Sequence, residues 1–147
     1  MGRKFKLVNL DPKFITENFE NLKICGQEDV VWNLWELENF LCPLDLKFEL
    51  SFCVLNDVEE IVAYSVLSTK QYGAHLHMFM VSVSCRNSGI GSFMWKEICK
   101  RLAFHNIQVL YLKVHETNTN AMRFYKRKNM KVVDLLDNHY LMSGTLL

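Results

Sequence analysis

The order of strand-like and helical segments is the feature that most limits how this chain can fold. Apolar alternation or short apolar runs indicate strands, and apolar residues at helical spacing indicate amphipathic helices. These patterns predict strands at residues 5–10, 48–55, 61–68, 75–83, 109–114, 131–136 and 140–146. They predict helices at 11–22, 89–105 and 118–128, with a further helix that ends before Pro43. The order β-α-α-β-β-β-α-β-α-β-β indicates an α/β architecture, in which helices cover a mixed sheet.

Length and composition predict one domain, residues 1–147. A chain of 147 residues, 50% of them hydrophobic, can build one core of ordinary size and has too few residues for a second. The formal net charge is only +1, so the overall field does not favour nucleic acid or an anionic membrane as a partner.

Three further features predict a cytoplasmic protein. The five cysteines contain no C-x-x-C pair and most lie in apolar stretches, which favours reduced thiols. The N-terminal stretch alternates like a strand and lacks the apolar block of a signal peptide. No apolar run approaches membrane-spanning length.

The stretch SCRNSGIGSF, residues 84–93, follows an apolar run and opens a helical pattern. The first N–H groups of a helix have no intrahelical acceptor, and the helix dipole favours an anion there. Glycines at 89 and 91 would let a phosphate approach the backbone, and Arg86 could add a charged fork. Two interpretations stay open on this motif alone: a phosphate site, or an ordinary turn between a strand and a helix.

A second motif, NTNAMRFY at residues 118–125, follows the next predicted strand. The pair of motifs, R-x-x-G-x-G after one strand and N-x-x-A-x-x-F-Y after the following strand, resembles the GNAT superfamily of acetyl-CoA-dependent N-acetyltransferases. The predicted element order resembles that family along essentially the whole chain. The resemblance implies a twisted, mostly antiparallel sheet of about seven strands flanked by about four helices.

The resemblance also implies acetyl-CoA as co-substrate and assigns its contacts. The main chain around 81–83 would pair with the pantetheine arm, residues 86–92 would hold the pyrophosphate, and Asn118 would contact the cofactor nearby. Tyr125 would lie beside the sulfur. The expected cofactor-binding set is Val81, Val83, Arg86, Ser88, Gly89, Ile90, Gly91, Ser92, Asn118 and Tyr125.

Acetyl transfer to an amine needs an acid for the departing thiolate and an acceptor for the proton of the amine. A phenol with a reference pKa of about 10 stays protonated at neutral pH, so Tyr125 suits the acid role. Burial of Tyr125 in the core is the structural alternative.

The sequence HLHMFMV supplies candidates for the second role. Strand alternation predicts that His75 and His77 share a face with Phe79 and Val81. The H-L-H before the glycine turn resembles the serotonin N-acetyltransferases, where two histidines are implicated in relaying a proton. His75 or His77, through water if necessary, is therefore the expected base. A satisfied core histidine beside an exposed one is the alternative.

The acceptor class stays open. The double histidine favours an alkylamine, an arylalkylamine or a lysine, because an amine with a pKa near 10.4 needs a clear base. The C-terminal half resembles the N-terminal acetyltransferases, in which tyrosines such as Tyr140 grip a peptide, although Lys113 stands where that branch has its base. Trp32 and Trp35 could line this pocket, with core packing as the alternative.

Other features suggest few further roles. Arg123, Lys126, Arg127 and Lys128 could meet the 3′-phosphate of CoA or form a solvated helix face. The histidines show no metal-ligand spacing, so no metal is expected. A homodimer is compatible with the resemblance. The rival function is a non-catalytic CoA-binding sensor or scaffold, which would not need Tyr125, His75 and His77.

Overall fold

The structure is a computed structural model that describes residues 4–27, 35–71 and 73–146. The strands are β1 (Lys6–Asn9), β2 (Phe52–Leu55), β3 (Ile61–Lys70), β4 (Gly73–Val81), β5 (Val109–His115), β6 (Lys131–Leu136) and β7 (His139–Thr145). The helices are α1 (Pro12–Gln27), α2 (Leu37–Leu41), α3 (Lys47–Leu50), α4 (Ile90–Phe104) and α5 (Thr119–Arg127), and a 3-10 turn, η1 (Val83–Cys85), precedes α4.

The seven strands form one sheet in the order β1-β2-β3-β4-β5-β7-β6. Every neighbouring pair is antiparallel except β4 and β5, which are parallel. These two strands pair only between residues 74–76 and 110–112, and beyond that point they separate. The mixed, mostly antiparallel sheet predicted from the sequence is thereby confirmed, and the separation leaves an opening in the middle of the sheet.

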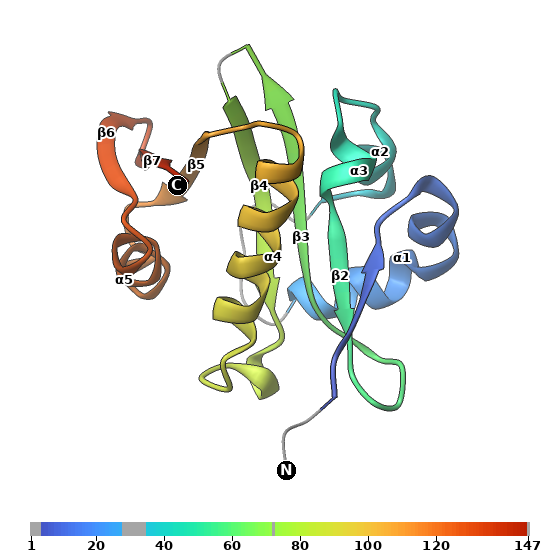
Figure 1. The fold of residues 1–147 in the computed structure, drawn as a ribbon. Coiled ribbons are helices and arrows are strands. Elements are labelled where there is room, and N and C mark those ends of the chain that lie inside the picture. The colour runs from blue at the N-terminus through green and yellow to red at the C-terminus, as the bar shows by residue number, and fades with distance from the viewer. Residues whose placement is uncertain (1–3, 28–34, 72, 147) are drawn as a thin grey trace.

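Helices cover both faces of the sheet. Figure 1 shows α4 crossing in front of β3 and β4, with α5 and the β6–β7 hairpin to one side of it. On the α4 face, Met94 and Ile98 pack against strand residues such as Leu76 and Leu112 in the larger core cluster. On the opposite face, a second cluster joins residues of α1 and α2 to β2 and β3: Ile15, Leu22, Cys25, Phe40, Cys53, Leu55, Tyr64 and Val66.

Two local features of the sequence, an Asp before Pro12 and the pair Asp137-Asn138, form the helix cap and the turn that such residues favour. Asp11 caps α1, because its Oδ1 accepts a hydrogen bond of 2.8 Å from the Phe14 N–H. The β6–β7 hairpin turns at Asp137 and Asn138, whose φ values of 47° and 67° suit a two-residue hairpin loop. No helix within the described ranges is long and apolar enough to cross a membrane.

Three predicted boundaries are wrong. The segment 48–55 is not a continuous strand, because Lys47–Leu50 forms a helical turn before β2 begins at Phe52. The helix that ends before Pro43 is Leu37–Leu41, capped by Glu36, so Trp35 precedes it instead of belonging to it. Residues 31–34 of that prediction, Trp32 included, lie outside the described residues. The strand predicted at 75–83 ends at Val81, and Val83 instead begins η1.

Candidate functional site

A cleft of about 980 Å³ opens where β4 and β5 separate. Its walls come from both faces of the sheet. Phe79 and Tyr125 belong to the α4 side, whereas Trp35 and Met80 pack with the cluster on the α1 side. The cleft therefore connects the two faces, so a molecule entering from the α4 side can meet another that enters from the α1 side.

The turn that leads into α4 borders the cleft at Arg86, Asn87, Gly89, Gly91 and Ser92. Within the part of the chain that the structure describes, the main-chain N–H groups of residues 88–92 donate no hydrogen bond. The side chain of Arg86 folds back, and its Nε donates to the Val81 carbonyl at 3.3 Å. The turn thus presents several N–H donors at the positive end of a helix of 15 residues, as an anion site requires.

The two glycines of the turn are required for different physical reasons. Gly89 has a φ of +89°, which favours glycine, and no atom lies within 4 Å of the place where a Cβ would stand. At Gly91 a Cβ would lie 3.2 Å from the ring of Phe124, so this glycine permits close packing of α4 against α5. Both glycines border the cleft, but only at Gly89 would an added Cβ stand in open space.

The other predicted residues of the turn lie beside the cleft. Ile90 is buried with its side chain in the core, so only its main chain is available to a ligand. The hydroxyl of Ser88 donates to the Cys85 carbonyl, and Ser92 accepts a hydrogen bond of 3.1 Å from Lys128 Nζ. Val83 is exposed and lies outside the cleft-lining set.

The edge of β4 that faces β5 is the second element of the cleft. Because the pairing with β5 stops at Leu76, the main chain of residues 77–81 has no strand beside it on that edge. Such an edge can pair with an extended ligand that carries amide groups, as in strand addition. The main chain available to a ligand is therefore that of residues 77–81, most of which precede the predicted stretch 81–83.

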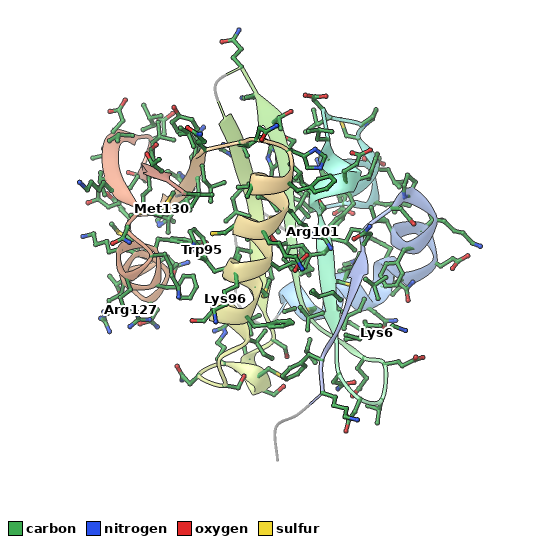
Figure 2. The ribbon with its side chains drawn as sticks, viewed as in Figure 1. Lys6, Trp95, Lys96, Arg101, Arg127 and Met130 are labelled. Atoms are coloured by element: carbon green, nitrogen blue, oxygen red, sulfur yellow. The ribbon has the colours of Figure 1, made fainter. Side chains whose placement is uncertain are left out.

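Helix α5 brings polar side chains to the cleft. Asn118 is its N-cap, since its Oδ1 accepts a hydrogen bond of 3.3 Å from the Ala121 N–H. Arg123 and Arg127, one turn apart, both line the cleft, and Figure 2 shows Arg127 at the outer end of α5. Two of the four predicted basic residues thus face the site, while Lys128 contacts the start of α4.

Tyr125 lies on the buried side of α5 and still lines the cleft. Its ring packs against Phe79, Trp95 and Phe124, with centroids 6.2, 6.0 and 5.7 Å away. Burial raises the pKa of the Tyr125 phenol above its ordinary value. The group therefore remains a proton donor throughout the neutral range, and it is both a core residue and a cleft residue.

His75 and His77 share one face, but Phe79 and Val81 do not lie on it. A β-bulge lies between the pairs Val66–Met78 and Leu67–Leu76, so that His77 is an extra residue of β4 without a partner on β3. A bulge shifts the alternation of side chains. Phe79 and Val81 therefore pack on the α4 side, whereas the ring of His77 lies 5.9 Å from that of Trp35 on the other side.

The two imidazoles lie together in a cationic environment. Their ring centroids are 4.7 Å apart, and His77 Nε2 lies 2.7 Å from the Ser68 hydroxyl. Burial, His75, Lys47 and Lys70 lower the pKa of His77 to about 4. Burial also lowers the pKa of His75, with smaller contributions from Lys70 and Lys113. Both rings are therefore neutral at physiological pH.

The sequence matches the family model described as the acetyltransferase (GNAT) family over residues 16–130. The chain belongs to this family. It is therefore an acyltransferase, as the two motifs predicted. No curated protein matches the sequence.

Solved structures show the same fold at low sequence identity. Ard1 from Thermoplasma volcanium is 19% identical, with 97% of this chain and 98% of that chain covered and a TM-score of 0.81. The ribosomal-protein-S18-alanine N-acetyltransferase from Escherichia coli is 14% identical, with coverage of 97% and 94% and a TM-score of 0.79. A NatC complex bound to Gag peptide and CoA is 13% identical, with coverage of 98% and 99% and a TM-score of 0.83.

One buried basic residue of this acetyltransferase was not predicted from the sequence. Lys47 is almost fully buried, and its Nζ donates to the carbonyls of Asn39 and Cys42, both at 2.7 Å. The same Nζ lies 5.3 Å from the ring centroid of Trp35. Lys47 therefore joins the end of α2 to the wall of the cleft. The segment looks strand-like in sequence, so nothing there indicated this role.

Of the two described aromatic residues predicted near the acceptor, one lies away from the cleft and one lines it. Tyr140 packs against the core on the α4 side and is not among the cleft-lining residues, so it does not face the side of His75 and His77. Trp35, in contrast, lines the cleft and also packs in the core. Among the residues that the structure describes, no group of three or more His, Cys, Asp or Glu side chains could hold a metal ion.

Proposed function

We propose that this acetyltransferase binds acetyl-CoA in the cleft between β4 and β5 and transfers the acetyl group directly to a primary amine. One observation supports this most strongly. A single cleft joins the unpaired N–H groups at the start of α4, the buried phenol of Tyr125 and the neutral pair His75–His77. Anion binding, proton donation and proton acceptance are thereby available within one site.

In this proposal the α4 turn binds the diphosphate of acetyl-CoA. The N–H groups of residues 88–92 donate to the phosphate oxygens, and Arg123 and Arg127 add positive charge. The amide groups of the pantetheine arm pair with the open edge of β4. This path leads the thioester to the aromatic wall formed by Phe79, Trp95 and Phe124, where Tyr125 lies.

The transfer then needs no covalent enzyme intermediate. The neutral amine enters from the α1 side, and its nitrogen lone pair forms a bond to the thioester carbonyl carbon as the carbon–sulfur bond breaks. Tyr125 donates its proton to the departing sulfur, and the proton of the amine leaves to water or to the imidazole of His75 or His77. The cysteine thiols take no part in this sequence of steps.

The imidazoles favour an acceptor amine of low pKa. Removing a proton from an alkylammonium at neutral pH costs about 4 kcal/mol, whereas an α-ammonium costs about 1 kcal/mol. A histidine with a pKa of about 4 is a weak base for the first task. We therefore propose the α-amino group at the start of a peptide, in preference to a polyamine or a lysine side chain.

The test is an assay of free CoA release with acetyl-CoA and a panel of acceptors. The panel contains short peptides with free N-termini, amino acids, an arylalkylamine and a polyamine, and mass spectrometry identifies the acetylated nitrogen. We expect acetylation of α-amino groups. Binding of CoA without acetylation of any acceptor would support the rival function, a non-catalytic sensor or scaffold. The cytoplasmic location, the single domain and the homodimer remain predictions.

A further inference from the structure

The α1 side of the cleft collects basic and imidazole groups from three strands. On β5, Leu110, Leu112 and Val114 are buried in the core on the α4 side. Strand alternation therefore directs Lys113 and His115 to the opposite face, the one that carries His75 and His77. Lys113 is exposed and lines the cleft.

His139 on β7 extends this group. It pairs with His115 across the sheet, and the two ring centroids lie 5.0 Å apart. The Nδ1 atom of His139 lies 3.0 Å from the Asp137 carbonyl, and that of His115 lies 2.7 Å from the Thr117 hydroxyl. We call Lys113, His115 and His139 the acceptor-side cluster. These residues form one wall of the cleft, on the same face of the sheet as His75 and His77.

Positive charge outweighs negative charge around the acceptor. Besides burial and the interaction of the two imidazoles, lysines lower the pKa values of this pair: Lys70 acts on both, Lys113 on His75 and Lys47 on His77. Asp137 is the one carboxylate among the described residues that line the cleft. An acceptor with a second positive charge is repelled in such a site, whereas a negative charge beside the amine is attracted.

The cofactor does not account for the acceptor-side cluster. Arg86, Arg123 and Arg127 come from the α4 turn and from α5, where the phosphates of acetyl-CoA are expected. Lys113 instead stands on the opposite face of the sheet. A negative group on the acceptor would meet Lys113 on this face.

We propose that the natural acceptor carries a carboxylate close to its amine, and that the acceptor-side cluster binds this carboxylate. The inference rests on the proposed function, because it specifies the substrate of the same site. An acidic peptide and a free amino acid present the same chemistry, and the test separates the two sources.

The experiment compares acceptors that differ in the charge of one side chain beside the reacting amine. Three peptides begin Ala-Glu, Ala-Gln and Ala-Lys and are otherwise identical, so the reacting amine is the same in all three. Free glutamate and its diamide, which carries no carboxylate, form a second pair. For the wild type we expect the kcat/KM of the Ala-Glu peptide to exceed that of the Ala-Gln peptide about tenfold, which corresponds to about 1.4 kcal/mol. The Ala-Lys peptide should be the poorest acceptor, and salt should reduce the differences.

The variant Lys113→Glu tests the cluster directly. We expect it to remove or reverse the preference for the acidic peptide. Lys6→Glu is the matched control, because Lys6 is also an exposed strand residue but lies on the edge strand β1, away from the cleft (Figure 2). That control should keep the wild-type preference.

The outcomes separate this inference from the proposed function. Equal kcat/KM values for the three peptides, or an unchanged preference in Lys113→Glu, would overturn the inference and leave the proposed function standing. If none of the acceptors is acetylated, the inference and the proposed function are both overturned. Faster acetylation of glutamate than of the Ala-Glu peptide would support the inference and identify a free amino acid as the source of the carboxylate.

Discussion

The rings of His75 and His77 lie with their centroids 4.7 Å apart on the face of β4 that points away from α4. Ordinary strand alternation puts the two histidines on one face, and the β-bulge beyond them turns Phe79 to the opposite face. Because both imidazoles are neutral at physiological pH, they accept a proton or a hydrogen bond but carry no charge. Their neutrality has consequences for activity and for stability.

The pH dependence of acetylation should follow the acceptor. The lowered pKa of His77, about 4, and the raised pKa of Tyr125 leave both groups unchanged in protonation between about pH 6 and 9. The kcat/KM should therefore rise with pH as the free amine loses its proton. Two acceptors with different amine pKa values should give midpoints that differ by the same amount. A common midpoint for both acceptors would show that a group on the enzyme controls the rate.

Acid should destabilise the fold through the same histidines. Below about pH 6.5 the unfolded chain binds a proton at His77 that the folded chain does not bind until about pH 4. The free energy of unfolding should therefore fall as the pH decreases through this window. The ring is only half-buried, so solvent screening limits the loss from His77 to about 1 kcal/mol. Urea unfolding at several pH values should give a shallower decline for His77→Gln, and an identical decline would contradict the lowered pKa.

Tyr125→Phe should lower kcat by a factor of about 100 to 10,000, the range typical of a general acid, because only the proton donor is lost. The affinity for CoA should change little, since the aromatic packing with Phe79 and Trp95 is kept. Steady-state kinetics and calorimetry measure the two quantities. Tyr140→Phe is the matched control, because Tyr140 packs away from the cleft. Equal kcat values for the two variants would remove Tyr125 as the acid.

Lys47→Met should lower the free energy of unfolding by about 2 to 4 kcal/mol, because two carbonyls at the end of α2 lose their hydrogen-bond donor. Lys6→Met, an exposed substitution, should change it by less than about 0.5 kcal/mol. Urea unfolding measures both variants. A small effect at Lys47 would show that water replaces its two hydrogen bonds.

Much of the fold could be predicted from the sequence because its strongest signals are local. The Asp11 cap, the Asp137–Asn138 turn and the helical spacing after Gly89 each act over a few residues. The segment at 47–50 was predicted wrongly, because its helical turn depends on the tertiary contacts of Lys47. Short apolar segments of this kind are decided by their surroundings more than by their own propensity.

The candidate site could be predicted only in part for a similar reason. The α4 turn and Asn118–Tyr125 are contiguous motifs, and the structure brings most of their residues to one cleft. The faces of β4 could not be predicted, since one bulged residue at His77 reverses the alternation beyond it. The role of Gly91 against Phe124 likewise depends on how two helices meet, which no local pattern encodes.

In the proposed complex, the start of α4 holds the diphosphate of acetyl-CoA. Titration calorimetry of CoA into the wild type and into Gly89→Glu tests it most directly, because Gly89 has a φ of +89° and faces open space. We predict saturable one-to-one binding to the wild type, and loss of binding in the variant through backbone strain and like charge. No binding to the wild type at millimolar CoA, or equal affinity in the variant, would contradict the account.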